Sequence, residues 1–252
     1  MQRRDLTGDK RFNARAVAAY AAGPASPRAA FKAAAGDAPA EIFVYGVVGQ
    51  DYWGEGTTAS DVVGFLAQAG AAPVTVRINS PGGDAFDGLA IYNVLRAHAP
   101  GVTVQVDGIA ASAASIIAMA GNPLIMPVAS MLMIHNARIR VAGSKEDFAA
   151  IGAALTKIDG VMAGVYASKS GKPAADMTAL MDAETYLTAD EAEDLGLCDT
   201  VLGDPDATEE VTEPTPAALA PVTFHAEVVD TTAAQAALAA ARARHLHLLE
   251  IS

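Results

Sequence analysis

Short apolar runs alternate with helix-forming segments between residues 41 and 203. The predicted strands are runs rich in Val and Ile, at residues 42–48, 74–78 and 102–106. A helix is predicted after each strand: one capped by Ser60, one over residues 86–97 and one beginning near Ser112. This alternation predicts an α/β fold in which mostly parallel strands are covered by helices.

Two shorter strands and one long helix complete the predicted core. The strands lie at residues 131–134 and 198–202. The helix spans residues 145–170, and its apolar side chains recur at spacings of three and four, at Phe148, Ile151, Leu155, Ile158, Met162 and Val165. Because its outer face carries few charges, two roles stay open: packing on its own core or packing on a second subunit.

The composition changes on both sides of this core. Residues 1–40 are rich in Ala, with basic residues and Pro/Gly interruptions, and we interpret them as an N-terminal arm. Residues 204–230 form an acidic, Pro/Thr-rich linker. Residues 231–252 form a helical tail with basic residues near its end, which either binds a partner or is simply solvated.

Charge and cysteine content narrow the function. A formal charge of −12 disfavours a nucleic-acid partner, because binding to phosphates needs clustered Lys and Arg. Cys198 is the single cysteine, so an internal disulfide and a multi-cysteine metal site are excluded, and we expect neither a metal nor a cofactor. The charged N-terminus resembles no secretory signal, and we expect a cytoplasmic protein.

Residues 108–134 contain no charged side chain, and about 20 apolar residues suffice to cross a bilayer. Serines and prolines interrupt this run, among them Ser112, Pro123 and Pro127. We therefore interpret it as a buried helix, a loop and a strand, and we expect no membrane contact.

Polar chemistry collects just past the ends of three predicted strands. The turn at residues 80–83 (Ser-Pro-Gly-Gly) can present bare backbone N–H groups. The turn at residues 108–111 leads into Ser112, a serine among very small neighbours. His135 ends the strand at 131–134, and histidine is the side chain best suited to accept a serine proton near neutral pH. Each feature alone has a structural explanation, but together they predict a nucleophilic site.

The motifs Ile78-Asn79-Ser80-Pro81-Gly82-Gly83, Gly108-Ile109-Ala110-Ala111-Ser112, Met133-Ile134-His135-Asn136 and Tyr186-Leu187-Thr188-Ala189 resemble those of the Clp protease proteolytic subunit (ClpP), a serine peptidase family. The resemblance covers residues 41–203 and is strongest to the phage and prophage head maturation (prohead) proteases. It implies a crotonase-like fold of repeated ββα units, assembly into rings, and a protruding handle helix at residues 145–170.

The resemblance also implies roles for single residues. Ser112 matches the nucleophile, His135 the general base, and the N–H groups of Gly83 and Ala113 the oxyanion hole. The third member of the triad matches Glu184, with Asp182 as the alternative acid on what could be the same face of a strand. Asp199 matches a recurring position that we interpret as structural.

The partners implied are protein or peptide substrates and further copies of the chain. No Gly-x-x-x-x-Gly-Lys-Ser/Thr run is present, so an unfolding ATPase would be a separate protein. In the phage branch the partners would be scaffold and capsid proteins of an assembling head. Two rival classes stay open: a crotonase-like acyl-coenzyme A enzyme, and an inactive structural homologue.

Overall fold

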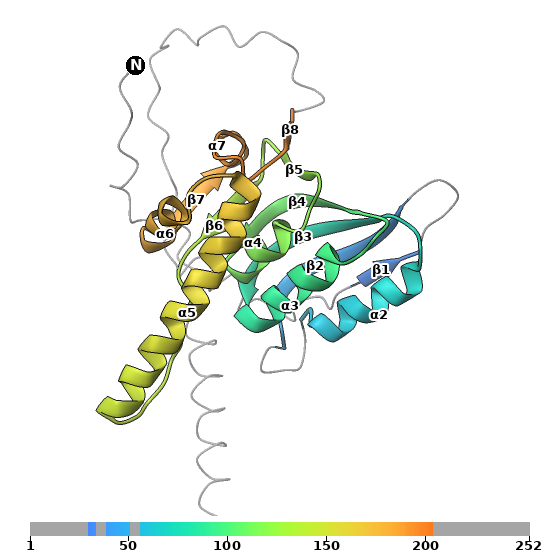
Figure 1. Ribbon diagram of the computed structural model, residues 1–252. Helices are drawn as coiled ribbons and strands as arrows, with labels where there is room; N and C mark the ends of the chain where they lie inside the picture. The colour runs from blue at the N-terminus through green and yellow to red at the C-terminus, as the bar shows by residue number, and fades with distance from the viewer. Residues whose placement is uncertain (1–29, 34–38, 51–55, 204–252) are drawn as a thin grey trace, which may run out of the picture. The chain divides into compact units, whose positions relative to one another are not determined.

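The computed structural model describes residues 30–33, 39–50 and 56–203 (Figure 1). The strands are β1 (Ala30–Lys32), β2 (Ala40–Val48), β3 (Val74–Gly83), β4 (Val102–Ala111), β5 (Leu124–Pro127), β6 (Met131–Ile134), β7 (Thr185–Thr188) and β8 (Thr200–Leu202). The helices are α2 (Ala59–Ala69), α3 (Ala85–Arg96), α4 (Ala113–Ala118), α5 (Lys145–Ser170), α6 (Ala174–Asp182) and α7 (Ala189–Asp194). The predicted linker and tail lie outside the described residues.

The strands form one sheet in the order β1-β2-β3-β4-β5-β8, and the four pairings from β2 to β8 are parallel. β1 pairs with β2 antiparallel, so residues 30–32 of the predicted arm belong to the sheet. β6 continues alongside the end of β4 and pairs antiparallel with β7. The predicted α/β class and the mostly parallel strands are confirmed.

The two faces of the central strands differ in burial. Alternate residues of β3 and β4 are fully buried, including Val76, Ile78, Val104 and Val106. Helices α2, α3 and α4 lie along one face of the sheet (Figure 1). On partly exposed positions of the same strands, Asp107 accepts hydrogen bonds from Arg77, Tyr45 and Gln105. The sheet therefore has an apolar core beneath its helices and a charged cluster at its polar positions.

Helix ends follow capping chemistry. The cap of α2 is Thr58 rather than the predicted Ser60, and the Thr58 hydroxyl and Asp61 carboxylate form a capping box. Ser144 and Asp147 do the same for α5, which ends at Gly171 in the left-handed conformation. The predicted helix over 145–170 is thus confirmed with its boundaries.

Helix α5 is buried only in its second half, at Met162, Ala163 and Tyr166. Phe148 near its start is 52% exposed. By length and composition α5 is the one helix among the described residues that could cross a membrane, and 17% of its most apolar stretch is buried. One such helix is weak evidence for a membrane span. The uncharged run at residues 108–134 forms the end of β4 together with α4, β5 and β6, and most of its residues are buried.

Two segments predicted to be turns are strand residues instead. Residues 80–83 continue β3, and residues 108–111 continue β4. The glycines permit this, because β2 and β3 change register between Tyr45 and Val47, and Gly82 and Gly83 then adopt φ values of 91° and 156°. Both strands therefore reach directly to the predicted site.

Candidate active site

Ser112 lies between β4 and α4 in an uncommon backbone conformation. Its φ is 54° and its ψ is −125°, and its side chain makes no capping hydrogen bond to α4. A positive φ in a residue other than glycine costs about 1–3 kcal/mol and is typical of functional turns. The surrounding structure holds the residue there, because its N–H donates to Met133 O at 2.9 Å. The hydroxyl is thus free to contact a side chain outside its own helix.

That side chain is His135, the first residue after β6. Its Nε2 lies 2.7 Å from Ser112 Oγ. β6 pairs with the end of β4 in register, with Ala111 opposite Met133, and this pairing places the residues that follow the two strands side by side. The predicted nucleophile and base are therefore in hydrogen-bond contact. For Nε2 to accept the serine proton, the proton of the neutral ring lies on Nδ1.

Nδ1 of His135 is buried and has no hydrogen-bond partner among the described residues. Burial lowers the pKa of His135 most strongly, and the nearby Arg138 guanidinium lowers it further. The carboxylates of Glu184 and Asp159 act in the opposite direction. A lowered pKa keeps the imidazole neutral at physiological pH, which is the form that can accept a proton.

Neither predicted acid is bonded to His135. Glu184 forms an ion pair with Arg138, and the side chain of Glu184 is 28% exposed. Asp182 accepts a hydrogen bond from Asn136 Nδ2 at 2.7 Å. Asp182 is the last residue of α6 and Glu184 lies between α6 and β7 with φ of 49°, so the idea that they share a face of a strand is wrong. Of the two, Glu184 is the one whose charge acts on the pKa of His135.

The glycine-rich end of β3 lies against the nucleophile. A Cβ atom on Gly82 would be 2.5 Å from Ala111 O, 2.7 Å from Ser112 Cβ and 3.0 Å from Ala113 N. Gly82 N–H donates to Ser80 Oγ, and Asp84 N–H donates to Val48 O. Gly83 lies between Gly82 and Asp84, and a Cβ atom on it would be 2.0 Å from Val48 O.

Three side chains near the site were not predicted from the sequence. Arg138 forms an ion pair with Glu184, Asp159 accepts from Ala137 N–H at 2.7 Å, and Tyr166 contacts Ser115 of α4. No motif marks them, because they meet the site only through the packing of α5 and of the segment after β6.

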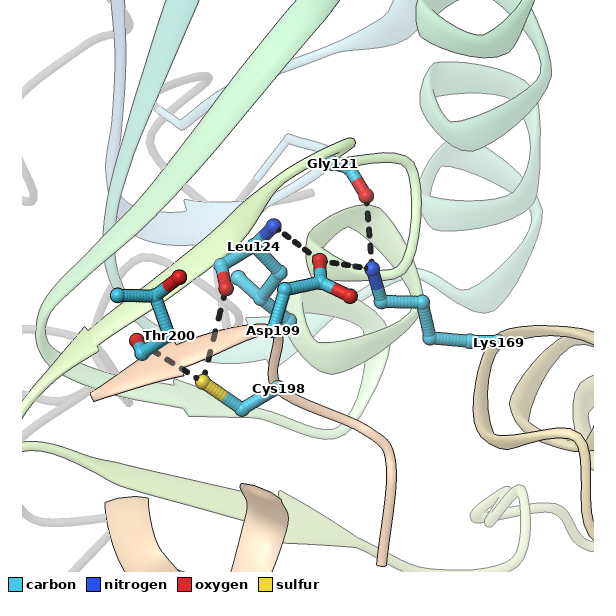
Figure 2. Close-up of polar contacts among 6 residues, drawn as sticks. All are labelled: Gly121, Leu124, Lys169, Cys198, Asp199 and Thr200. Carbon is cyan, nitrogen blue, oxygen red and sulfur yellow. Dashed lines mark hydrogen bonds and ion pairs between the residues drawn. The ribbon is translucent and has the colours of Figure 1, made fainter.

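Asp199 and Cys198 make structural contacts between β5, β8 and the end of α5. Asp199 accepts from Leu124 N–H at 2.6 Å and pairs with Lys169, which also donates to Gly121 O at 2.9 Å (Figure 2). Cys198 is buried, its thiol faces the carbonyls of Leu124 and Thr200, and burial raises its pKa. These contacts join the end of α5 to β5 and β8, which agrees with the structural interpretation of Asp199.

Comparison with known proteins identifies the family. The Clp protease family model matches residues 40–205. The ATP-dependent Clp protease proteolytic subunit 3 of Rhodococcus jostii is 29% identical over 145 residues, covering 57% of this chain and 72% of the relative. Proteolytic subunit 1 of Chlamydia caviae is 31% identical over 134 residues, covering 52% of this chain and 70% of the relative.

A solved structure of a ClpP1 mutant from Listeria monocytogenes has the same fold. Its TM-score is 0.56 at 23% identity, over 66% of this chain and 92% of that chain. The fold and the serine-histidine contact define a serine peptidase, and the chain belongs to the Clp protease family. The predicted ClpP-like fold is confirmed.

Proposed function

We propose that Ser112 is the nucleophile of a serine endopeptidase and that His135 is its general base. The observation that carries this proposal is the 2.7 Å contact between Nε2 and Oγ, made by a neutral imidazole whose pKa is lowered by burial. Ser112 Oγ attacks the scissile carbonyl carbon while its proton passes to Nε2. The proton then moves to the leaving amine, and an acyl-enzyme remains on Ser112. Water releases the acyl group by the same two steps.

The oxyanion formed during attack needs donors, and we propose the N–H groups of Gly83 and Ala113. Ala113 is the first residue of α4, where a helix leaves its N–H groups without an intrahelical acceptor. The closeness of Gly82 to Ala113 N supports the pairing of these two segments. Each such donor contributes about 3–4 kcal/mol to transition-state stabilisation in related chemistry.

The third member of the triad is proposed to be Glu184. His135 Nδ1–H lacks an acceptor, and the charge of Glu184 already favours the imidazolium. A catalytic complex therefore requires the Glu184 carboxylate to exchange Arg138 for His135. Family membership supports this peptidase over the acyl-coenzyme A alternative.

For the substrates, we propose unfolded polypeptides delivered by a separate ATPase, because the relatives are subunits of ATP-dependent proteases. The test is degradation of a folded and an unfolded protein by the full chain, alone and with a Clp ATPase and ATP. Degradation of the folded protein only with ATPase and ATP supports the proposal. Degradation by the Ser112→Ala variant at the wild-type rate contradicts it, and no degradation of either protein by the wild type under any condition favours an inactive homologue.

Ring assembly is proposed on the exposed apolar side chains of α5. Phe148 is 52% and Val161 is 53% exposed, which is unfavourable for a helix surrounded by water. Replacing both with Gln should shift the full chain from an oligomer to smaller species in light scattering. An unchanged mass would contradict this role for α5.

Phage head maturation is the finer proposal, and it rests on the resemblance and on the change of composition after residue 203. Its substrates would be scaffold and capsid proteins, with the tail as a docking or self-processed extension. An intact tail after assembly, together with normal assembly of a chain lacking it, would contradict the role of the tail.

A further inference from the structure

Two buried hydroxyl groups, those of Ser115 and Tyr166, are connected to the carbonyl group of Ser112 by consecutive hydrogen bonds. We call these two hydrogen bonds the side-chain relay. Ser115 Oγ is 2.5 Å from Ser112 O, and Tyr166 OH is 2.7 Å from Ser115 Oγ. Both Ser115 and Tyr166 are fully buried, with 0% of their surface exposed. These contacts join α5, which carries Tyr166, to the turn that carries the nucleophile.

The donor and acceptor of each of these two hydrogen bonds can be assigned. A carbonyl oxygen only accepts, so the proton of Ser115 is directed to Ser112 O. Ser115 Oγ then receives its own hydrogen bond from the Tyr166 hydroxyl. Burial raises the pKa of Tyr166 far above its ordinary value, so the phenol stays protonated and remains a donor.

The carbonyl it reaches belongs to a residue in an unfavourable conformation. Ser112 has φ of 54°, and its N–H is held on the other side by Met133 O. Its carbonyl also accepts from two backbone groups, Ser115 N–H at 2.9 Å and Ile116 N–H at 3.4 Å. The Ser115 hydroxyl adds a third and shorter hydrogen bond to this carbonyl, at 2.5 Å, in a dry environment where a hydrogen bond is strong. Its loss also leaves the buried Tyr166 hydroxyl without its acceptor.

We propose that Ser115 and Tyr166 are positioning residues that hold Ser112 at the angle from which its hydroxyl meets His135. This rests on the proposed function of Ser112. Because Tyr166 belongs to α5, the relay also makes the position of the nucleophile depend on how α5 packs against α4. Loss of the relay should disturb the chemical step and leave substrate binding unchanged, because neither side chain is exposed to substrate.

The test compares Ser115→Ala and Tyr166→Phe with two matched controls in the full chain. Ser130→Ala removes another buried serine hydroxyl, one that donates to Pro127 O at 2.8 Å. Tyr92→Phe removes the hydroxyl of a half-buried tyrosine packed on the core. All variants are measured for kcat and KM on a fluorogenic peptide and for the rate of fluorophosphonate labelling, per folded molecule.

We expect kcat and the labelling rate to fall by about tenfold in both variants, with KM within about twofold, because a shift of the nucleophile of a fraction of an ångström slows the chemical step. The double variant should lose no more than Ser115→Ala alone, since Tyr166 acts through Ser115. Tyr166→Phe removes a single oxygen atom, so its kcat and labelling rate test the proposal even if Ser115→Ala does not fold.

Wild-type rates in both variants would overturn the proposal, as would equal losses in the controls. These outcomes differ from failure of the proposed function, in which the wild type itself is not labelled on Ser112.

Discussion

His135 contacts Ser112 through Nε2, 2.7 Å from Oγ, and its Nδ1 is buried without a hydrogen-bond partner. His135 can therefore accept the proton of Ser112. The carboxylate proposed to stabilise the imidazolium, that of Glu184, is paired with Arg138 instead. Two of the charged groups that act on the pKa of His135, Arg138 and Glu184, form an ion pair with each other.

Glu184→Gln should lower kcat/KM for a peptide by about ten- to a hundredfold, because Nδ1 loses the acceptor that stabilises the imidazolium. Asp182→Asn should change it little, since Asp182 contacts Asn136 instead. Both variants lose one negative charge close to the site, so each is the control for the other. Equal rates in the two would show that Glu184 has no catalytic part.

Arg138→Gln should raise the pKa of His135, because the guanidinium lowers it and because release of Glu184 strengthens an opposing carboxylate. The neutral imidazole is the active form, so activity is lost as pH falls through this pKa. The acidic limb of the kcat/KM profile should therefore move to higher pH in this variant. Glu184→Gln should move it the other way. A limb that stays in place in Arg138→Gln would argue against His135 as the titrating base.

Gly82→Ala should abolish activity, because the new methyl group would lie 2.7 Å from Ser112 Cβ and 2.5 Å from Ala111 O, at a φ of 91°. Gly64→Ala is the control, since a Cβ there meets nothing within 4 Å inside helix α2. We expect the control to gain about 0.5–1 kcal/mol in stability with unchanged kcat. Full activity in Gly82→Ala would mean that the end of β3 does not shape the site.

Asp107→Ala should destabilise the fold by about 2 kcal/mol, because Arg77 and the Tyr45 hydroxyl lose a shared, mostly buried acceptor. The free energy of unfolding in urea measures this. In a double-mutant cycle with Arg77→Met, the two losses should overlap rather than add. Additive losses would show that the cluster is held by other contacts.

The order of motifs along the chain predicted Ser112 and His135, because each follows an apolar strand and parallel strands end at one edge of a sheet. The length of the strands was predicted wrongly from the residues at their ends. Pro81, Gly82 and Gly83 are typical of a turn, but a change of register and positive φ values let β3 continue through them. Leu124–Pro127 was not predicted as a strand, since prolines at 123 and 127 flank so short a segment.

The rest of the site depends on tertiary packing that no local pattern encodes. Tyr166 carries no motif, and its contact with Ser115 arises only once α5 lies beside α4. The same holds for the acid: the family resemblance implied Glu184, but its ion pair with Arg138 depends on the path of the segment after β6. Sequence thus predicts the chemistry, and packing decides which partners each group has.

Fluorophosphonate labelling of the full chain, with the labelled peptide identified by mass spectrometry, tests the central claim most directly. The reagent modifies only an activated serine. We predict label on Ser112 in the wild type, no label at position 112 in Ser112→Ala, and labelling slower by about a thousandfold in His135→Ala. Label on another serine, or labelling that persists in His135→Ala, would contradict the assignment of Ser112 and His135 as nucleophile and base.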